Sequence, residues 1–162
     1  MHPDNPLLKK ALNRLPQNFK KEKRNSLKII PKKLAHLAGE LALEKKAFDV
    51  KILDLHQIST VCDFFVICSA SVDIHAQAIA EWITGNLENR GVKYWHHEGY
   101  QASRWILLDY VDVVVHIFLP EVREFYALEK LWGDAKVEDI TEEKPLKKTA
   151  KTQKEISTRK KN

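Results

Sequence analysis

The chain has 162 residues, 44% hydrophobic and 30% charged, a composition typical of one globular domain. No apolar run approaches the ~20 residues of a membrane-spanning helix, and the N-terminus carries no secretory-type hydrophobic segment. The net charge of +5 is unevenly divided: residues 1–31 carry eight Lys or Arg against two acids, 141–162 carry eight against three, and 32–140 carry eleven against seventeen. The sequence therefore predicts an acidic domain over 32–140, between a basic N-terminal arm, 1–31, and a lysine-rich C-terminal tail, 141–162.

The two basic segments contain too few apolar residues to fold alone and are predicted to be flexible. Such segments either contact nucleic acid through its phosphates or keep a protein in solution, and both interpretations stay open. A mitochondrial presequence is less favoured, because lysine dominates over arginine and prolines interrupt the arm. Cys62 and Cys68 have no CxxC spacing, so we expect no disulfide framework and favour a reducing cytoplasm.

Taken in chain order, helical spacing predicts a helix over 32–48, with Phe48 on its apolar face. Strands follow over 50–55 and 64–68, and the second is fully apolar, which favours a central position in a sheet. A turn of small residues leads into a helix over about 73–90. Its predicted inward face consists of Ile74, Ala78, Ile79, Trp82, Ile83 and Leu87.

A short strand over 92–96 and a polar loop come next. Two apolar runs, 105–108 and 113–118, are separated by only four residues, which predicts an antiparallel hairpin. Pro120 then begins a helix whose apolar positions are Phe125, Leu128, Leu131 and Trp132. This order of elements predicts an α/β fold, a mixed sheet with helices packed on it.

Several polar side chains raise the question of catalysis. A serine-containing turn before Asp73, with Asp109 and Asp112 further along, resembles the carboxylate sets that hold two magnesium ions in nucleotidyltransferases. The turn contains no glycine and no Asp-x-Asp pair occupies one strand, so a helix cap at Asp73 and a turn role for Asp109 and Asp112 are favoured. The sequence predicts no enzymatic activity and no cofactor.

A metal site could be suggested by three histidines, His96, His97 and His116. Adjacent residues of a strand point to opposite faces, so His96 and His97 do not readily share an ion. Solvated or hydrogen-bonded roles are therefore favoured, and no metal is expected.

The hairpin residues Trp105, Leu107, Leu108, Asp109 and Tyr110 allow two interpretations, anchors of a protein interface or ordinary burial in the sheet. In an ideal strand Trp105, Leu107 and Asp109 share one face and Leu108 lies on the other. Because aspartate is a poor core residue, the face of Trp105 is predicted to bind a partner and Leu108 to point inward.

Two blocks carry a resemblance, DFFVICSASVDIHAQAIAEWI (63–83) and EGYQASRWILLDYVDVVVHIFLPEVREFYALEKLWGDA (98–135). Together they make residues 33–135 resemble the ribosomal silencing factor family, also called Iojap-like. The resemblance implies a nucleotidyltransferase-like fold without the catalytic residues, usually as a homodimer in the bacterial cytoplasm. It also implies binding to the large ribosomal subunit through its protein numbered fourteen, which blocks joining of the small subunit and represses translation when nutrients are scarce.

Carried over by match, the implied partner-binding residues are Trp105, Leu107, Leu108, Asp109 and Tyr110, with Asp112 in the same turn. Val111 stands where family members commonly have glycine, and since a β-branched residue resists positive φ, a different turn type is predicted. The basic tails lie outside the family pattern and could contact ribosomal RNA. A metal-dependent nucleotidyltransferase and an RNA-binding module driven by the tails stay open as alternatives.

Overall fold

A computed structural model describes residues 29–142, and the predictions about the outermost parts of both basic segments, 1–28 and 143–162, lie outside the described residues. The helices are α3 (Pro31–Glu44), α4 (Asp73–Asn89), α5 (Pro120–Tyr126) and α6 (Leu128–Leu131). The strands are β1 (Phe48–Asp54), β2 (Phe64–Ser69), β3 (His96–Glu98), β4 (Trp105–Asp109), β5 (Val113–Phe118) and β6 (Lys136–Asp139). No helix of this described part is long and apolar enough to cross a membrane.

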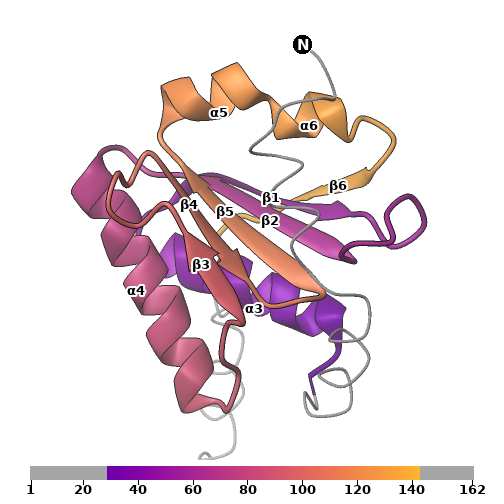
Figure 1. The fold of residues 1–162 in the computed structure, drawn as a ribbon, viewed down its shortest axis with the longest axis horizontal. Helices are drawn as coiled ribbons and strands as arrows, with labels where there is room; N and C mark the ends of the chain where they lie inside the picture. Colours follow the sequence, from indigo (N-terminus) through magenta and orange to yellow (C-terminus); the bar gives the residue numbers. More distant parts are fainter. Residues whose placement is uncertain (1–28, 143–162) are drawn as a thin grey trace, which may run out of the picture.

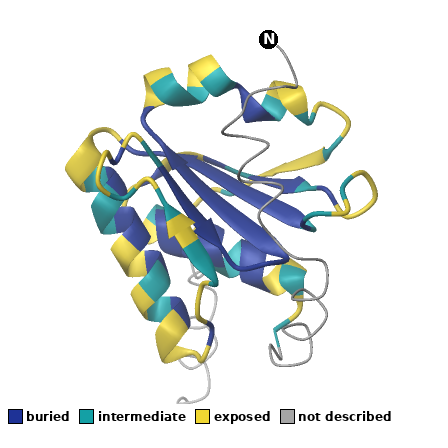
Figure 2. Cartoon of the chain, in the orientation of Figure 1, coloured by how far each residue is buried: buried dark blue, intermediate teal, exposed yellow. Residues whose placement is uncertain are grey.

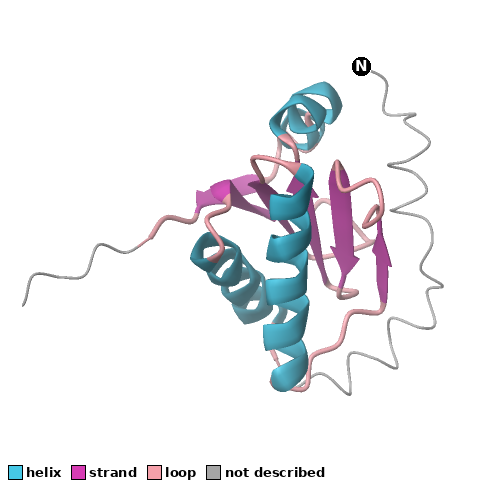
Figure 3. Cartoon of the chain, turned by 90° about the vertical axis from the view of Figure 1, so that its left-hand side faces the viewer, coloured by secondary structure: helices cyan, strands magenta, loops and turns pink. Residues whose placement is uncertain are grey.

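The strands form one mixed sheet in the order β3-β4-β5-β2-β1-β6. β2 and β5 are parallel, and the other neighbours are antiparallel. Helices α3 and α4 cover one face of the sheet, and the short helices α5 and α6 lie on the opposite face (Figure 1). Figure 3 shows this layering from the side. The predicted α/β class with a mixed sheet is therefore confirmed.

Burial explains why β2 and β5 lie at the centre of the sheet. Every residue of β2 and of β5 is buried, which suits two parallel strands covered by helices on both faces (Figure 2). The core on the α3 and α4 side includes Ile79, Ile83 and Leu108, and the core on the α5 and α6 side includes Phe65 and Leu128.

Two helical predictions need correction. The first helix ends at Glu44, because Lys46 adopts a φ of 62° and turns the chain, so Phe48 begins β1 and is not on a helix face. In α4, Ile74 is 72% exposed and Trp82 36% exposed, so neither lies inward. The helix instead buries a narrower stripe that consists of Ala76, Ile79, Ala80, Ile83 and Leu87.

The later part of the chain also departs from prediction. The strand expected over 92–96 is β3, which begins only at His96. The helix expected after Pro120 is broken at Ala127, which has a φ of 43°, and Phe125 is 69% exposed where an inward position was predicted. The edge strand β6 was not predicted, because its four residues are all exposed and carry no apolar alternation.

Candidate partner-binding site

The β4–β5 hairpin holds most of the predicted site residues. The register pairs Trp105 with Phe118 and Asp109 with Val114, as the predicted hairpin requires. Leu108 belongs to the core beneath α3 and α4, whereas Leu107 belongs to the core beneath α5 and α6, with Trp105 packed against it. The prediction that Leu108 points to the opposite face from Trp105 and Leu107 is confirmed.

Burial decides between interface anchors and sheet burial for most of these residues. Leu107, Leu108, Asp109 and Tyr110 are each 5% exposed or less, and Asp112 is 9% exposed. Only Trp105 is partly open to solvent. Of the two interpretations left open, ordinary burial in the sheet therefore holds for five of the six side chains within the single chain.

The tip of the hairpin is a tight turn built by its own polar groups. The Asp109 Oδ1 accepts a hydrogen bond from the Val111 N–H at 2.8 Å, and the Tyr110 carbonyl accepts one from the Asp112 N–H at 3.0 Å. Val111 has a φ of 75°, so the premise that a β-branched residue would avoid positive φ at this position is wrong. The Asp112 carbonyl also accepts from the Phe64 N–H at 3.0 Å, which ties the turn to the start of β2.

Burial also sets the chemistry of Tyr110 at this end of the sheet. Its side chain is 1% exposed, and its hydroxyl makes no hydrogen bond with the residues the structure describes. Desolvation raises the pKa of Tyr110 well above its ordinary value, with smaller effects from Tyr94 and Glu88. The group is therefore neutral over the physiological range and suits a structural role.

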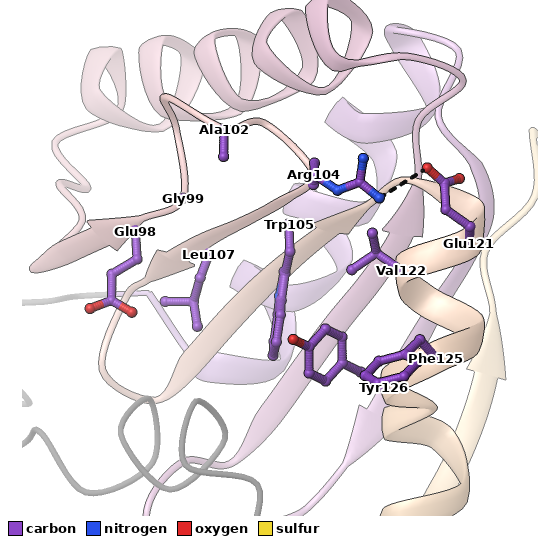
Figure 4. A pocket seen from close by; sticks show the side chains of 10 residues that line it. All are labelled: Glu98, Gly99, Ala102, Arg104, Trp105, Leu107, Glu121, Val122, Phe125 and Tyr126. Carbon is purple, nitrogen blue, oxygen red and sulfur yellow. Dashed lines mark ion pairs between the residues drawn. The ribbon is translucent and has the colours of Figure 1, made fainter.

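The open feature beside the hairpin is an apolar groove of about 560 Å³ between α5 and the β3–β4 edge (Figure 4). We call it the Trp105 groove. Its lining consists of Glu98, Gly99, Ala102, Arg104, Trp105, Leu107, Glu121, Val122, Phe125 and Tyr126. Of the predicted site residues, Trp105 and Leu107 reach this groove.

Aromatic packing fixes the wall of the groove. The Trp105 ring stacks on Phe118, with centroids 4.8 Å apart and planes at 28°, and lies 4.7 Å from the Tyr126 ring. The Trp105 Nε1–H donates a hydrogen bond to His116 Nδ1 at 3.1 Å. Phe125 stands beside Tyr126 at 5.1 Å and projects from α5 into solvent. The spacing of apolar residues assigned Phe125 to the core. Its exposure depends on the break of the helix at Ala127, which the sequence does not signal.

Acidic and basic groups occupy the rim. Arg104 Nη2 lies 3.6 Å from Glu121 Oε1, and both side chains are 60% exposed. Glu98 lies at the opposite side of the groove (Figure 4). Protein interfaces commonly combine an apolar core with a polar rim, and the Trp105 groove has both.

The structure separates the carboxylates that resembled a nucleotidyltransferase set. Asp73 begins α4 just after the C-terminal end of β2, whereas Asp112 is bonded to the first residue of β2. The six residues of β2 lie between them, roughly 20 Å at ~3.3 Å each. Asp73 Oδ1 accepts from the Ile74 N–H at 2.8 Å, and the buried Ser69 hydroxyl accepts from Arg123 at 2.8 Å.

The side chains of the three histidines do not converge on one point either. His96 Nε2 lies 3.2 Å from Glu98, His97 packs on Tyr94, and His116 is buried in β5. Within residues 29–142, no three His, Cys, Asp or Glu side chains gather as a metal site would require.

These observations define an α/β domain that carries an aromatic groove beside its β4–β5 hairpin. The sequence model of the family described as "Ribosomal silencing factor during starvation" matches residues 28–162, and the chain belongs to this family. The matched range reaches the C-terminus, whereas the resemblance seen in the sequence covers about 33–135.

Comparisons with individual relatives support the same family. The chain is 40% identical over 109 residues to the ribosomal silencing factor of Bacillus subtilis, covering 67% of this chain and 92% of that protein. It is 36% identical over 97 residues to the chloroplastic Iojap protein of Zea mays, covering 60% of this chain but 42% of that protein. A crystal structure of a Chromobacterium violaceum protein is similar with a TM-score of 0.63 at 30% identity, covering 65% of this chain and 88% of that one.

Proposed function

We propose that this protein represses translation by binding the large ribosomal subunit through its protein fourteen, in the way that blocks joining of the small subunit. The observation that carries the proposal is the Trp105 groove, whose partly buried Trp105 and exposed Phe125 have the character of interface anchors. Membership of the ribosomal silencing factor family supports the ribosome as the partner. The acidic balance of residues 32–140 suits a basic ribosomal protein and would speed and orient the encounter.

Burial divides the roles of the predicted contact residues. We assign direct contact to Trp105 and Leu107, which reach the groove. Leu108, Asp109, Tyr110 and Asp112 would act by holding the hairpin in shape, because they are enclosed in the single chain.

The test is sedimentation of the full chain with purified large subunits. Trp105→Ala should weaken binding by about 2 kcal/mol or more, as hot-spot aromatics do. Trp82→Ala is the matched control, since Trp82 is a partly exposed tryptophan on α4, away from the groove lining. Equal loss of binding in both variants, or in neither, would refute the groove as the binding site.

The cellular setting and the assembly state are part of the proposal. We propose a bacterial cytoplasm as the setting, which the 40% identity to the ribosomal silencing factor of Bacillus subtilis supports. We also propose a homodimer in the free state, and sedimentation equilibrium of the purified protein tests it.

The basic tail is assigned a contact with ribosomal RNA. Residues 141–162 carry eight Lys or Arg against three Glu, and phosphate contacts by such a segment release counterions. Deletion of 141–162 should therefore weaken ribosome binding modestly and flatten its dependence on salt. An unchanged salt slope would exclude this role.

Finally, we propose that the protein has no enzymatic activity, because the acids of the nucleotidyltransferase alternative lie at opposite ends of β2. Incubation with each nucleoside triphosphate and magnesium tests this. Turnover that Asp109→Asn abolishes would restore the alternative.

A further inference from the structure

His116 is a polar residue in an apolar place. It lies in the middle of β5 and is 1% exposed. Its ring meets Phe65 edge-on, with centroids 4.5 Å apart and planes at 73°, and lies parallel to Phe118 at 6.0 Å. Burial lowers its pKa to about 3, so the imidazole is neutral at physiological pH.

The hydrogen bond from Trp105 fixes the tautomer of this imidazole. His116 Nδ1 accepts from the Trp105 Nε1–H at 3.1 Å, so the ring proton resides on Nε2. That Nε2 is buried and makes no hydrogen bond with any residue between 29 and 142. A buried N–H without an acceptor destabilises a fold, and an apolar ring would avoid this. Stability alone therefore does not explain a histidine at this position.

What His116 does contribute is a fixed direction for the Trp105 indole. Phe118 stacks on the indole and the Tyr126 ring lies against it at a tilt of 45°, but such contacts tolerate changes in χ1 and χ2 that swing the ring. A single acceptor on the inner edge removes this freedom, because a rotated indole would leave both Nε1 and Nδ1 unpaired. The indole then presents its outer edge and face to the Trp105 groove.

We propose that His116 is a positioning residue for partner binding, which holds the indole of Trp105 in the orientation that shapes the groove. His116 does not line the groove and acts only through the indole. The inference rests on the proposed function, in which Trp105 contacts the ribosomal partner. A pre-oriented anchor binds more tightly because less rotational freedom is lost on binding.

The test is a double-mutant cycle in the full chain, with binding to purified large subunits as the first measurement. His116→Phe keeps an aromatic ring but removes the acceptor, and should weaken binding about 3- to 10-fold, the value of one neutral hydrogen bond. His116→Asn places an oxygen near the position of Nδ1 and should recover binding to within about twofold of the parent. In a Trp105→Phe background, which lacks the donor, His116→Phe should change binding less than about twofold.

The second measurement is spectroscopic and independent of the ribosome. In protein labelled with ¹⁵N-tryptophan, the Trp105 Nε1–H signal should shift upfield and exchange faster with solvent in His116→Phe, and should recover in His116→Asn. The Trp82 Nε1–H, which donates to Glu44 at 2.9 Å on the other face, is the internal control and should not move.

The outcomes separate the inference from the proposed function. If Trp105→Ala abolishes binding while His116→Phe changes neither binding nor the Trp105 signal, the inference is overturned and the proposed function stands. If His116→Phe weakens binding equally in both backgrounds, His116 acts by another route and the inference is again overturned. Normal binding by Trp105→Ala would refute the proposed site and the inference together.

Discussion

The buried imidazole of His116 makes a quantitative prediction about acid stability. Burial lowers its pKa from 6.5 to about 3 in the folded chain, whereas the unfolded chain keeps the ordinary value. Between these two values the unfolded chain takes up a proton that the folded chain excludes, so stability is complete above about pH 6.5 and falls as the solution is acidified.

The size of the effect follows from the two pKa values. Each pH unit below 6.5 costs about 1.4 kcal/mol, so stability at pH 4.5 is lowered by roughly 3 kcal/mol from this group alone. The limit near pH 3 is about 5 kcal/mol. Against a typical total stability of about 5–15 kcal/mol, a loss of this size is large enough to measure by urea unfolding.

The assay is urea unfolding of the parent chain and of His116→Phe at several pH values between 7.5 and 4.5. Carboxylates titrate alike in both proteins, so the difference between the two stabilities isolates His116. His116→Phe should be the less acid-sensitive protein, with a difference that changes by about 1.4 kcal/mol per pH unit below 6.5. Parallel stability curves would show that the folded chain accepts the proton, which would refute the reasoning.

Three further predictions concern the framework of the domain. A Cβ at Gly99 would lie 1.9 Å from the main-chain oxygen at the start of β4, so Gly99→Ala should lower stability by more than about 2 kcal/mol in thermal melts. Gly91→Ala, at a similar φ with no atom within 4 Å, should cost only about 1 kcal/mol, and equal losses would count against the clash. Arg123→Met removes two contacts with one oxygen of Glu129 in α6, at 2.6 and 2.8 Å, together with the hydrogen bond to Ser69, and should cost about 1.5–3 kcal/mol in urea melts. The exposed Arg104→Met should cost less than about 1 kcal/mol, and a ranking in the other order would contradict this account. Burial raises the pKa of the Cys68 thiol to about 12, so it should resist DTNB at pH 8 until the chain is unfolded, and rapid reaction of native protein would show that β2 is open.

Local pattern was enough to predict the centre of the sheet. The apolar run of β2 and the two runs of the hairpin have strand length and strand composition, and the structure places all three at the expected positions within a residue. The alternation of faces from Trp105 to Leu108 was predictable too, because it follows from the period of a strand alone.

Turns formed by a non-glycine residue with a positive φ were not predictable from the sequence. Phe125 and Trp132 are seven residues apart, which suggests one helical face, but Ala127 adopts a φ of 43° and rotates the second turn away. Arg123 bridges the break by binding Glu129, an interaction that has no signature in the apolar spacing. The exposure of Phe125, and with it one wall of the groove, was therefore hidden from the sequence.

Val111 shows the same limitation at the hairpin tip. A β-branched residue at a φ of 75° is strained, yet its N–H is held by Asp109 Oδ1 and its side chain is 2% exposed. The burial of the Val111 side chain and the hydrogen bond to its N–H offset the free-energy cost of its positive φ. The strand β6 likewise forms through pairing with β1, since its own sequence carries no strand pattern.

Exposure along β4 depends on the strand beside it. β3 pairs with β4 from Asp109 to Leu107 and stops short of Trp105. At that point Gly99, with a φ of 80°, lets the chain approach the β4 backbone more closely than a side chain would permit, and the loop then turns away. Leu107 is consequently only 5% exposed where it lines the groove, while Trp105, two residues earlier on the same face, is left at an open end. The alternation along β4 assigns residues to a face, but the length of β3 and the glycine after it decide how much of each residue on that face is exposed.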